Sequence, residues 1–361
     1  MKIMINGATS GTNFGDYLFA QMYQNHISKI VGKDNVCWFD NYFAYSEFYK
    51  SHLKNENSCR LKDVDALVYM PGGYFCGSIN TLKNYLIVFW MYFKIGLKCI
   101  RRKKPIIILG MEVSHSKNFF IEKIQKKLMR KAKVVSVRNQ QSYEVAKSYG
   151  VKNLYCLTDN VFAMEEDLYA HCEVSDEIKN IEGKKLFLHI NPLITQNVKI
   201  KEKIVPIINK FLDNHPEYTV ILGADQYYEG AIETMQDVSK EINTSKVVFN
   251  FYDNPLALCK VLSVVDTIVT TKLHVGIVGA KFGKSVISFS GHTEKIERLY
   301  EQLGEGGRTT PLVDLKFEKG VEMLELYHDK PIKVSDEIIE KAKLNFVLLD
   351  NFLEEIKNNK K

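Results

Sequence analysis

Two short stretches late in the chain carry side chains that can bind an anion and move a proton. They cover residues 268–274 and 286–295, and each begins as an apolar run and ends in polar residues. The polar positions include hydroxyls, two lysines and two histidines: Thr270, Thr271, Lys272, His274, Ser290, His292, Thr293 and Lys295. Lysine supplies a compact positive charge, and histidine transfers protons near neutral pH. The two stretches therefore predict a site for a small, multiply charged anion.

The elements that must position these groups are two strands and two helices. Residues 268–271 and 286–290 are rich in β-branched and apolar side chains and predict strands, whereas the small apolar run 273–280 predicts a helix. In open α/β sheets ligands bind at the carboxyl ends of strands, where helix N-termini favour anions. Polar residues also follow strands in proteins without a ligand there, so the spacing alone leaves a structural role open.

The first half of the chain offers two loops with a similar layout. An apolar strand at 2–6 runs into a loop at 7–16 that is rich in glycine and hydroxyls, and a second strand at 64–70 ends in Pro71-Gly72-Gly73-Tyr74. Glycine lets the backbone approach a ligand closely. The first loop lacks the GK[ST] ending of a phosphate-binding Walker loop. A plain turn, with Asp16 as an acidic residue at a helix start, fits that loop equally well.

Strands and helices alternate along the whole chain, which favours βαβ units and parallel sheets. We expect two doubly wound Rossmann-like α/β domains facing a central cleft, at 1–180 and 181–335. Residues 336–361 are predicted to form a C-terminal helix with a lysine tail, and this helix can cross back to the first domain. Further strands are predicted at 106–110, 134–138, 154–160, 186–192, 219–223 and 246–249.

Length and composition narrow the class of protein. The 361 residues suffice for about two domains. The net charge of +6 suits anionic ligands or an anionic membrane surface, but is too weak to imply nucleic acid. Seven dispersed cysteines without a CxxC pair indicate reduced thiols rather than disulfides or zinc. The chain starts directly with a strand instead of a signal peptide, so we expect a cytoplasmic location.

One segment departs from the globular pattern. Residues 84–100 are almost wholly apolar and aromatic, and the basic cluster 101–104 follows. The apolar run is too short to span a bilayer, which takes about 20 residues. A helix lying in the membrane interface fits the combination of aromatic and basic residues, and the basic amphipathic segment 121–133 supports that interpretation. A buried helix between two strands fits as well, so both interpretations stay open for segment 84–104.

Several short motifs follow one another in a distinctive order: Asn13-Phe14-Gly15-Asp16, Pro71-Gly72-Gly73, Ser136-Val137-Arg138-Asn139-Gln140-Gln141-Ser142, Thr158-Asp159-Asn160 and Lys272-Leu273-His274. Their order and spacing over roughly residues 1–300 resemble the polysaccharide pyruvyl transferase family. Asn139 stands where the family has Asp, and Lys272 stands where it has Arg. Lysine keeps the charge but loses the bidentate fork that matches phosphate or carboxylate, which shifts more of the recognition to Arg138.

The resemblance implies a GT-B-like fold and a transfer reaction. The donor would be phosphoenolpyruvate and the acceptor a sugar of a surface or capsular polysaccharide, or of its polyprenyl-diphosphate-linked precursor. The product would be a pyruvate ketal on two hydroxyls, with phosphate released. The chemistry asks for an acid, assigned to His274, and for cations, assigned to Arg138 and Lys272. Neither a cofactor nor a metal is expected.

The resemblance also divides the predicted site into a donor side and an acceptor side. The predicted donor-binding residues are Arg138, Lys272, His274, His189, Asn191, Ser290, His292 and Thr293. The predicted acceptor-binding residues are Asn13, Asp16, Gly72, Gly73 and Tyr74. A lipid-linked acceptor would place the enzyme peripherally on the cytoplasmic membrane face. Two alternatives remain: a GT-B glycosyltransferase that uses a nucleotide sugar, with Glu294 on the ribose, and a non-catalytic, membrane-associated glycan-binding protein.

Overall fold

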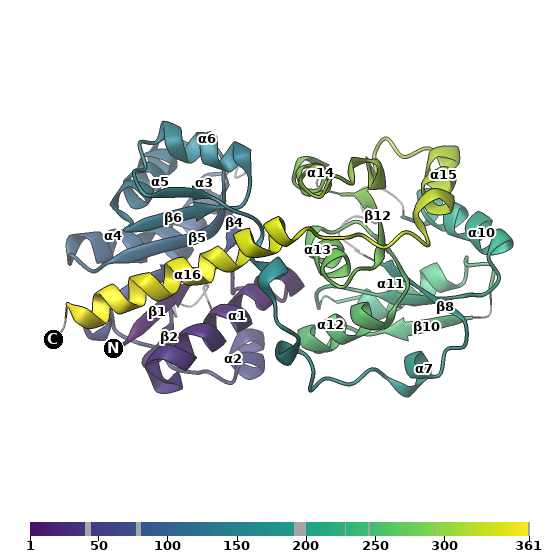
Figure 1. The fold of residues 1–361 in the computed structure, drawn as a ribbon, viewed down its shortest axis with the longest axis horizontal. Helices are drawn as coiled ribbons and strands as arrows, with labels where there is room; N and C mark the ends of the chain where they lie inside the picture. Colours follow the sequence, from purple (N-terminus) through teal and green to yellow (C-terminus); the bar gives the residue numbers. More distant parts are fainter. Residues whose placement is uncertain are drawn as a thin grey trace. The chain divides into compact units, whose positions relative to one another are not determined.

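The chain folds into two compact units, which are described separately. The computed structural model describes residues 1–39, 45–76, 81–190, 200–227, 229–244, 246–291 and 293–359. The first domain comprises Met1–Thr12, Asp16–Met164 and Asp336–Lys361, and the second comprises Asn13–Gly15 and Glu165–Ser335. Each contains one parallel sheet flanked by helices (Figure 1). The predicted α/β class with two doubly wound domains is confirmed.

The first sheet has the order β2-β1-β3-β5-β6-β7, with β4 pairing the far end of β5. The order reverses direction between β1 and β3, which are hydrogen-bonded neighbours. Such a switch point is where open α/β sheets bind ligands. Most of these strands are runs of buried apolar residues, as parallel sheets covered on both faces require, whereas the edge strand β7 is only partly buried. Their bounds are β1 Ile3–Asn6, β2 Val36–Trp38, β3 Ala66–Tyr69, β4 Gly72–Phe75, β5 Ile106–Val113, β6 Val134–Val137 and β7 Leu154–Cys156.

The C-terminal helix α16 (Asp336–Asn358) belongs to the first domain, so the predicted return of the chain to that domain is confirmed. Two buried polar contacts fix it there: Ser136 Oγ donates to Asn345 Oδ1 at 2.5 Å, and Thr158 Oγ1 donates to the Ile338 carbonyl at 2.8 Å. The other main helices of this domain are α1 Phe14–Val31, α2 Glu47–Leu53, α3 Leu82–Val88, α4 Lys94–Arg101, α5 Phe119–Lys131 and α6 Gln140–Ser148.

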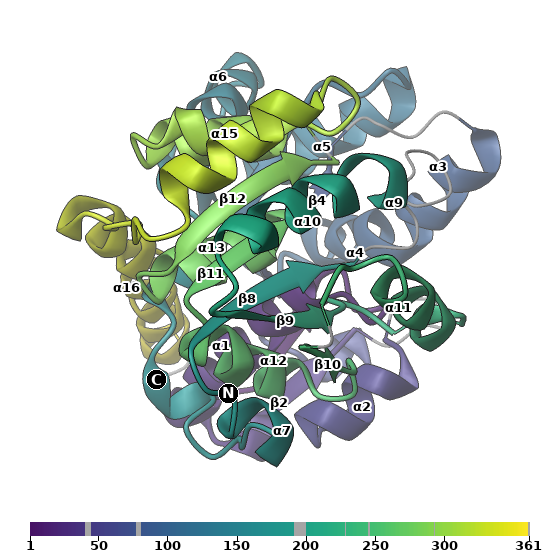
Figure 2. The same cartoon turned by 90° about the vertical axis from the view of Figure 1, so that its right-hand side faces the viewer.

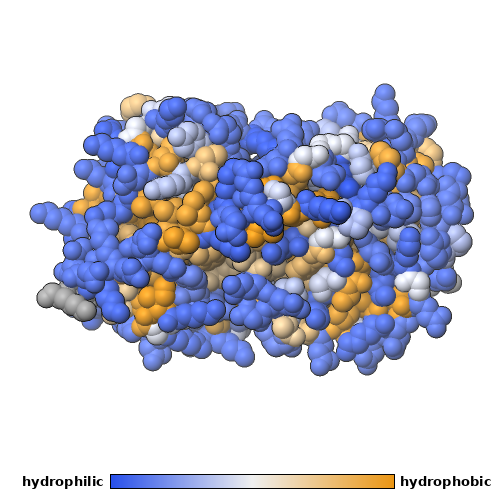
Figure 3. All heavy atoms as spheres, in the orientation of Figure 1, coloured by the Kyte–Doolittle hydropathy of each residue, from blue (hydrophilic) through white to orange (hydrophobic). Residues whose placement is uncertain are grey.

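The apolar segment forms α3, a π-helical turn at Phe89–Phe93 and α4 in succession. One face packs into the core through side chains that include Tyr92 and Phe93. The other face leaves Leu86 53% and Trp90 47% exposed. Among the described residues, no helix combines the length and the apolar character needed to cross a bilayer. Figure 3 shows a mostly hydrophilic face of the molecule on which apolar side chains form small patches.

The second sheet has the order β10-β9-β8-β11-β12-β13. Counted within the domain from β8, this is 3-2-1-4-5-6, the order of dinucleotide-binding folds, and its switch point lies between β8 and β11. Figure 2 shows α10 (Val205–Asn214) and α15 (Phe317–Tyr327) on one face of this sheet. The strands are β8 Lys184–His189, β9 Tyr218–Gly223, β10 Val247–Asn250, β11 Thr267–Thr270, β12 Ser285–Ser290 and β13 Thr309–Pro311. The remaining helices are α7 Asp176–Lys179, α9 Ile200–Lys203, α11 Ala231–Ser239, α12 Pro255–Val264, α13 Leu273–Lys281 and α14 Thr293–Gln302.

Candidate functional site

The carboxyl edge of the second sheet brings together residues that lie far apart in the sequence. His189 is the last residue of β8, Asp225 follows β9, and Lys272 follows β11. Because β9, β8 and β11 are adjacent and parallel, their carboxyl ends meet at the switch point. We call His189, Asp225, Lys272 and His274 the Asp225 cluster. The sequence analysis predicted three of its members and missed Asp225.

Asp225 is the centre of this cluster. Its Oδ1 lies 3.2 Å from His189 Nε2, and its Oδ2 lies 3.8 Å from Lys272 Nζ. On the other side of the imidazole, Thr271 Oγ1 lies 3.4 Å from His189 Nδ1. His189 is fully buried and Asp225 is nearly so, whereas the Lys272 side chain is 14% exposed. The contacts thus hold a buried carboxylate between a buried histidine and a more accessible lysine.

The charges around Asp225 keep it ionised in spite of its burial. Burial alone would raise the pKa of the Asp225 carboxyl. Lys272, then His189 and finally His274 oppose this effect and lower the pKa from 3.8 to about 2. A buried carboxylate is stable only with such compensation. Asp225 is therefore an ionised, pre-ordered carboxylate at neutral pH.

Helix α13 adds a second source of positive potential. It begins at Leu273, directly after Lys272, whose side chain makes no capping hydrogen bond. The Lys272 amide instead donates to Thr270 Oγ1 at 3.0 Å. Glycine at position 279 lets the helix lie against the sheet, because a Cβ there would come within 2.6 Å of Ile268 Cδ1. The positive end of the helix thus falls at the strand ends, with partly buried His274 in its first turn.

The remaining predicted donor-binding residues differ in what the structure describes. Ser290 ends β12, the neighbour of β11, so it reaches the same sheet edge; it is buried, and its Oγ has no hydrogen-bond partner among the described residues. Thr293 is the first residue of α14, but its side chain lies outside the description. Asn191 and His292 also lie outside the described residues. Their assignments stay predictions.

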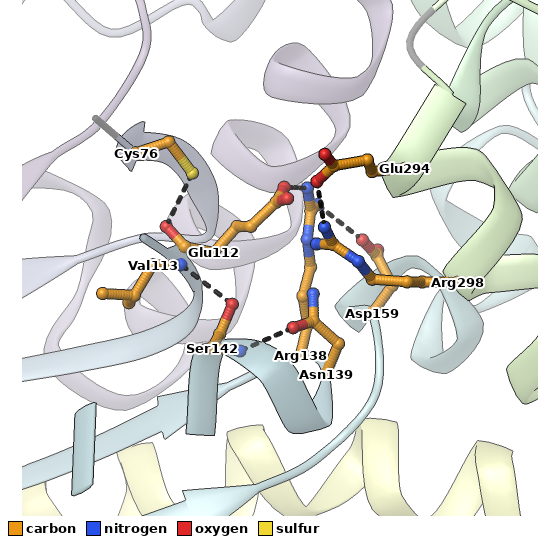
Figure 4. Close-up of polar contacts among 9 residues, drawn as sticks. All are labelled: Cys76, Glu112, Val113, Arg138, Asn139, Ser142, Asp159, Glu294 and Arg298. Atoms are coloured by element: carbon orange, nitrogen blue, oxygen red, sulfur yellow. Dashed lines mark hydrogen bonds and ion pairs between the residues drawn. The ribbon is translucent and has the colours of Figure 1, made fainter. Parts of the chain in front are cut away.

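Arg138 lies in the first domain, where it forms an ion triad with two carboxylates. It follows β6, and its Nη1 donates to Asp159 Oδ2 at 2.9 Å while its Nη2 donates to Glu112 Oε2 (Figure 4). Glu112 lies on β5 and Asp159 follows β7, so the triad ties three adjacent strands together at one edge. All three side chains are at most 8% exposed. Burial would lower the pKa of Arg138, but Glu112 and Asp159 outweigh it and raise that pKa.

The two carboxylates of the triad bear on whether Arg138 can bind an anion. Within the first domain two carboxylates already compensate its charge, which leaves the triad with a net negative charge. Such an arrangement favours a positioning role for Arg138 over the predicted direct contact with an anion. Its assignment as a donor ligand remains a prediction.

Asn139, which departs from the family pattern, caps helix α6. Its Oδ1 accepts a hydrogen bond from the Ser142 amide at 2.8 Å, and Ser142 Oγ accepts from the Val113 amide at 2.9 Å (Figure 4). Asn and Asp serve equally well as N-caps. The same close-up shows Glu294 and Arg298 paired one helical turn apart on α14, so this carboxylate, assigned to a ribose in the glycosyltransferase alternative, already has a cationic partner.

Four of the predicted acceptor residues, Asp16, Gly72, Gly73 and Tyr74, belong to the first domain. Gly72 and Gly73 belong to strand β4 rather than to a loop. Tyr74 is nearly buried; its hydroxyl donates to the Met70 carbonyl at 2.5 Å, and its ring stacks on Tyr92 at 4.4 Å. Burial, and after it the charge of Asp16, raises the pKa of Tyr92, which places Asp16 beside this aromatic pair. Tyr74 therefore packs against Tyr92 and the backbone at Met70 and has a structural role there.

Asn13 groups with the second domain, as do Phe14 and Gly15. The Phe14 amide donates to the Asp225 carbonyl at 2.9 Å. Residues 13–15 are part of the motif Asn13-Phe14-Gly15-Asp16. Only the last residue of that motif, Asp16, falls in the first domain. The predicted grouping of Asn13 and Asp16 on one acceptor side stays untested.

A cavity of about 470 Å³ lies at the opposite edge of the first sheet, where the strands begin. The basic cluster 101–104 and helix α5 both contribute lysines to it, and Lys133 pairs with Glu355 of α16 at 2.7 Å. Its lining consists of Asp65, Ile100, Lys103, Lys104, Pro105, Lys131, Lys133, Phe352, Glu355, Ile356 and Asn359. The cavity is separated from the carboxyl edge by the length of the strands.

Comparison with known proteins identifies both a family and a fold. The model of the polysaccharide pyruvyl transferase family matches residues 13–293. No curated protein matches the chain. A UDP-GlcNAc 2-epimerase from Neisseria meningitidis, bound to UDP-GlcNAc, has a TM-score of 0.66 at 10% identity over 98% of this chain and 100% of its own. MurG from Acinetobacter baumannii has a TM-score of 0.53 at 12% identity over 98% and 99%. At these identities the likeness concerns the fold alone, and it confirms the GT-B-like prediction.

Proposed function

The chain belongs to the polysaccharide pyruvyl transferase family, and from that membership we propose that it transfers the pyruvyl group of phosphoenolpyruvate onto two hydroxyls of one sugar. The sugar would be part of a surface polysaccharide or of its lipid-linked precursor. The observation that carries this proposal is the Asp225 cluster at the switch point between β8 and β11. It offers the Lys272 ammonium, a helix N-terminus and the partly buried imidazole of His274 at one sheet edge.

Phosphoenolpyruvate matches the charge of this edge. Its carboxylate and phosphate need cationic partners, which Lys272 and the first turn of α13 supply. Asp225 holds the ammonium of Lys272 in place, and His189 holds Asp225. Because His189 is fully buried, we assign it a positioning role rather than the predicted contact with the donor.

The reaction needs one proton at carbon and two oxygen nucleophiles. His274 gives a proton to the methylene carbon of the donor, which becomes a methyl group and leaves the adjacent carbon electrophilic. The first sugar hydroxyl adds to that carbon. The phosphate then leaves with the electron pair of its C–O bond, and the second hydroxyl adds to the same carbon. Of the two hydroxyl protons released, one restores His274 and the other leaves on phosphate, so the balance closes.

A lipid-linked acceptor agrees with the packing of the apolar segment. Asn6, at the carboxyl end of β1, donates from Nδ2 to the carbonyls of Met91 and Tyr92 at 3.3 Å each. These bonds hold the π-helical turn at the carboxyl end of β1, near the predicted acceptor residue Tyr74. Leu86 and Trp90 of the same segment remain exposed. We propose that these two side chains contact an anionic bilayer beside the acceptor.

The membrane contact can be measured by flotation with anionic liposomes. The variant L86S/W90S should float less than the wild type, because it loses the exposed apolar contacts. Val347→Ser is the control, since Val347 is 48% exposed, similar to the exposed fractions of Leu86 and Trp90, and lies on α16 of the same domain. Equal flotation of all three proteins would reject the contact.

The transfer itself is tested by mass spectrometry of lipid-linked glycans after incubation with phosphoenolpyruvate. The expected product is heavier than the acceptor by pyruvate less one water, and phosphate appears in equal amount. His274→Ala should form no product, whereas His171→Ala, which alters an exposed histidine elsewhere in the second domain, should form it normally. Unchanged glycan masses, together with consumption of a nucleotide sugar, would favour the glycosyltransferase alternative.

A further inference from the structure

A second cluster of ionisable side chains lies at the amino edge of the second sheet. His215 follows α10, Glu325 lies in the last turn of α15, and His328 follows that helix. One potential ligand atom from each residue lies within 4.8 Å of the other two, and within the described ranges no other three such residues meet this criterion. His215 lies 110 positions before Glu325, whereas Glu325 and His328 are only three positions apart. The Glu-x-x-His spacing of the second pair is one that metal sites use, but it was not singled out in the sequence.

The side chains of this cluster lie close to one another. His215 Nε2 lies 2.8 Å from Glu325 Oε2. The two imidazole rings are 4.4 Å apart between centroids and are tilted by 50°. The three side chains are neither fully buried nor fully exposed.

Outer partners orient two of these ligands. The second oxygen of Glu325 accepts a hydrogen bond from Asn214 Nδ2 at 2.8 Å. Nδ1 of His328 lies 3.1 Å from the Tyr218 hydroxyl. In addition, the ring of Phe211 stacks on His215 at 4.5 Å. Metal-binding histidines and carboxylates are typically held by such outer hydrogen bonds, which fix the orientation of the ligating atoms.

We propose that His215, Glu325 and His328 bind a divalent transition-metal ion, with zinc as the best match. Two imidazole nitrogens and one carboxylate oxygen form a donor set that zinc accepts, with water as the fourth ligand. Magnesium and calcium prefer oxygen-only sites. An ion with ligand distances of about 2.0–2.2 Å fits ligand atoms that all lie within 4.8 Å of one another, the His215–Glu325 pair being 2.8 Å apart.

The position of the site makes the proposed ion structural rather than catalytic. Strand β9 begins at Tyr218, which contacts His328, and ends at Gly223, two residues before Asp225. Six strand residues span roughly 17 Å at about 3.3 Å per residue. The ion would instead link the ends of α10 and α15, the two helices on one face of the sheet (Figure 2).

The test is metal binding by the untagged, full-length protein after chelator treatment. Titration with zinc chloride should give one equivalent bound and a higher melting temperature, and cobalt chloride should give the intense visible bands of a tetrahedral site. Glu325→Gln and His328→Ala should each abolish the cobalt bands. Asn214→Ala should weaken zinc binding by about 10- to 100-fold, since it removes only an outer partner. His171→Ala should leave binding unchanged.

Two results would overturn the proposal. One is the absence of tetrahedral cobalt bands in the wild type, which would leave a plain His215–Glu325 ion pair. The other is binding that persists in both Glu325→Gln and His328→Ala. Circular dichroism of each variant shows whether it folds. Should His328→Ala not fold, Glu325→Gln decides, because it preserves the size of the side chain and the oxygen that faces Asn214.

Discussion

Replacing Arg138 by methionine should destabilise the first domain far more than it affects donor binding. The change keeps much of the side-chain volume but removes the cation between Glu112 and Asp159, whose side chains are only 4% and 5% exposed. Removing one partner of a buried ion pair typically costs about 3–5 kcal/mol. With two carboxylates left facing each other, we expect a loss in the free energy of unfolding at the upper end of that range.

Tryptophan fluorescence during urea denaturation measures this loss in the correct domain. The chain has two tryptophans, Trp38 and Trp90, and both belong to the first domain. A triple variant, R138M/E112Q/D159N, serves as the matched control. It removes all three charges while preserving side-chain shape, so it should recover most of the stability lost in R138M, because a neutral, well-packed replacement of a buried ion cluster costs little.

The opposite pattern would refute this reasoning. If R138M unfolded at the same urea concentration as the wild type but bound phosphoenolpyruvate much more weakly, Arg138 would be a donor ligand, as the sequence motif predicted. Failure of the triple variant to regain stability would likewise show that the triad does not act through its charges.

Three further predictions follow from single contacts. Asp225→Asn should lower the free energy of unfolding by about 2 kcal/mol at pH 7. Because the folded-state pKa of Asp225 is lowered from 3.8 to about 2, its contribution is complete above pH 4 and is lost as the pH falls toward 2, so urea titrations of wild type and variant should converge there. Lys272→Met should raise the KM for phosphoenolpyruvate about 10- to 100-fold through loss of a charged contact, and an unchanged KM in steady-state assays would exclude that contact. Gly110→Ala should cost about 1–3 kcal/mol, because φ is +59° and the new Cβ would overlap Asn160; Gly11→Ala, with open space around it, should cost little in the same denaturation assay.

The fold was predictable because its strands are long apolar runs that alternate with helices. The central strands β3, β5 and β9 were all located from such runs. The three-residue strands β2 and β13 were missed, whereas the equally short β7 was located, because so short a run gives only a weak signal. Strand β4 was interpreted as a glycine loop, since nothing in its sequence shows that it pairs with the far end of β5.

The candidate site was predictable where its residues directly follow a strong strand. Lys272 and His274 were found in this way. Asp225 follows the strand β9 by the same rule, and applying that rule to every strand would have found it. Glu112 carried no such signal, because it lies inside the buried run of β5 and is recognised only through its contact with Arg138. Of the cluster at the amino edge, the Glu325–His328 spacing is visible in the sequence, but its proximity to His215 comes from tertiary packing.

Calorimetric titration with phosphoenolpyruvate tests the proposed donor site most directly. The wild type and the charge-free triple variant should bind with similar affinity, whereas Lys272→Met should bind about 10- to 100-fold more weakly. A wild type that takes up UDP-GlcNAc but gives no heat with phosphoenolpyruvate would contradict the account, as would equal affinities in the wild type and Lys272→Met.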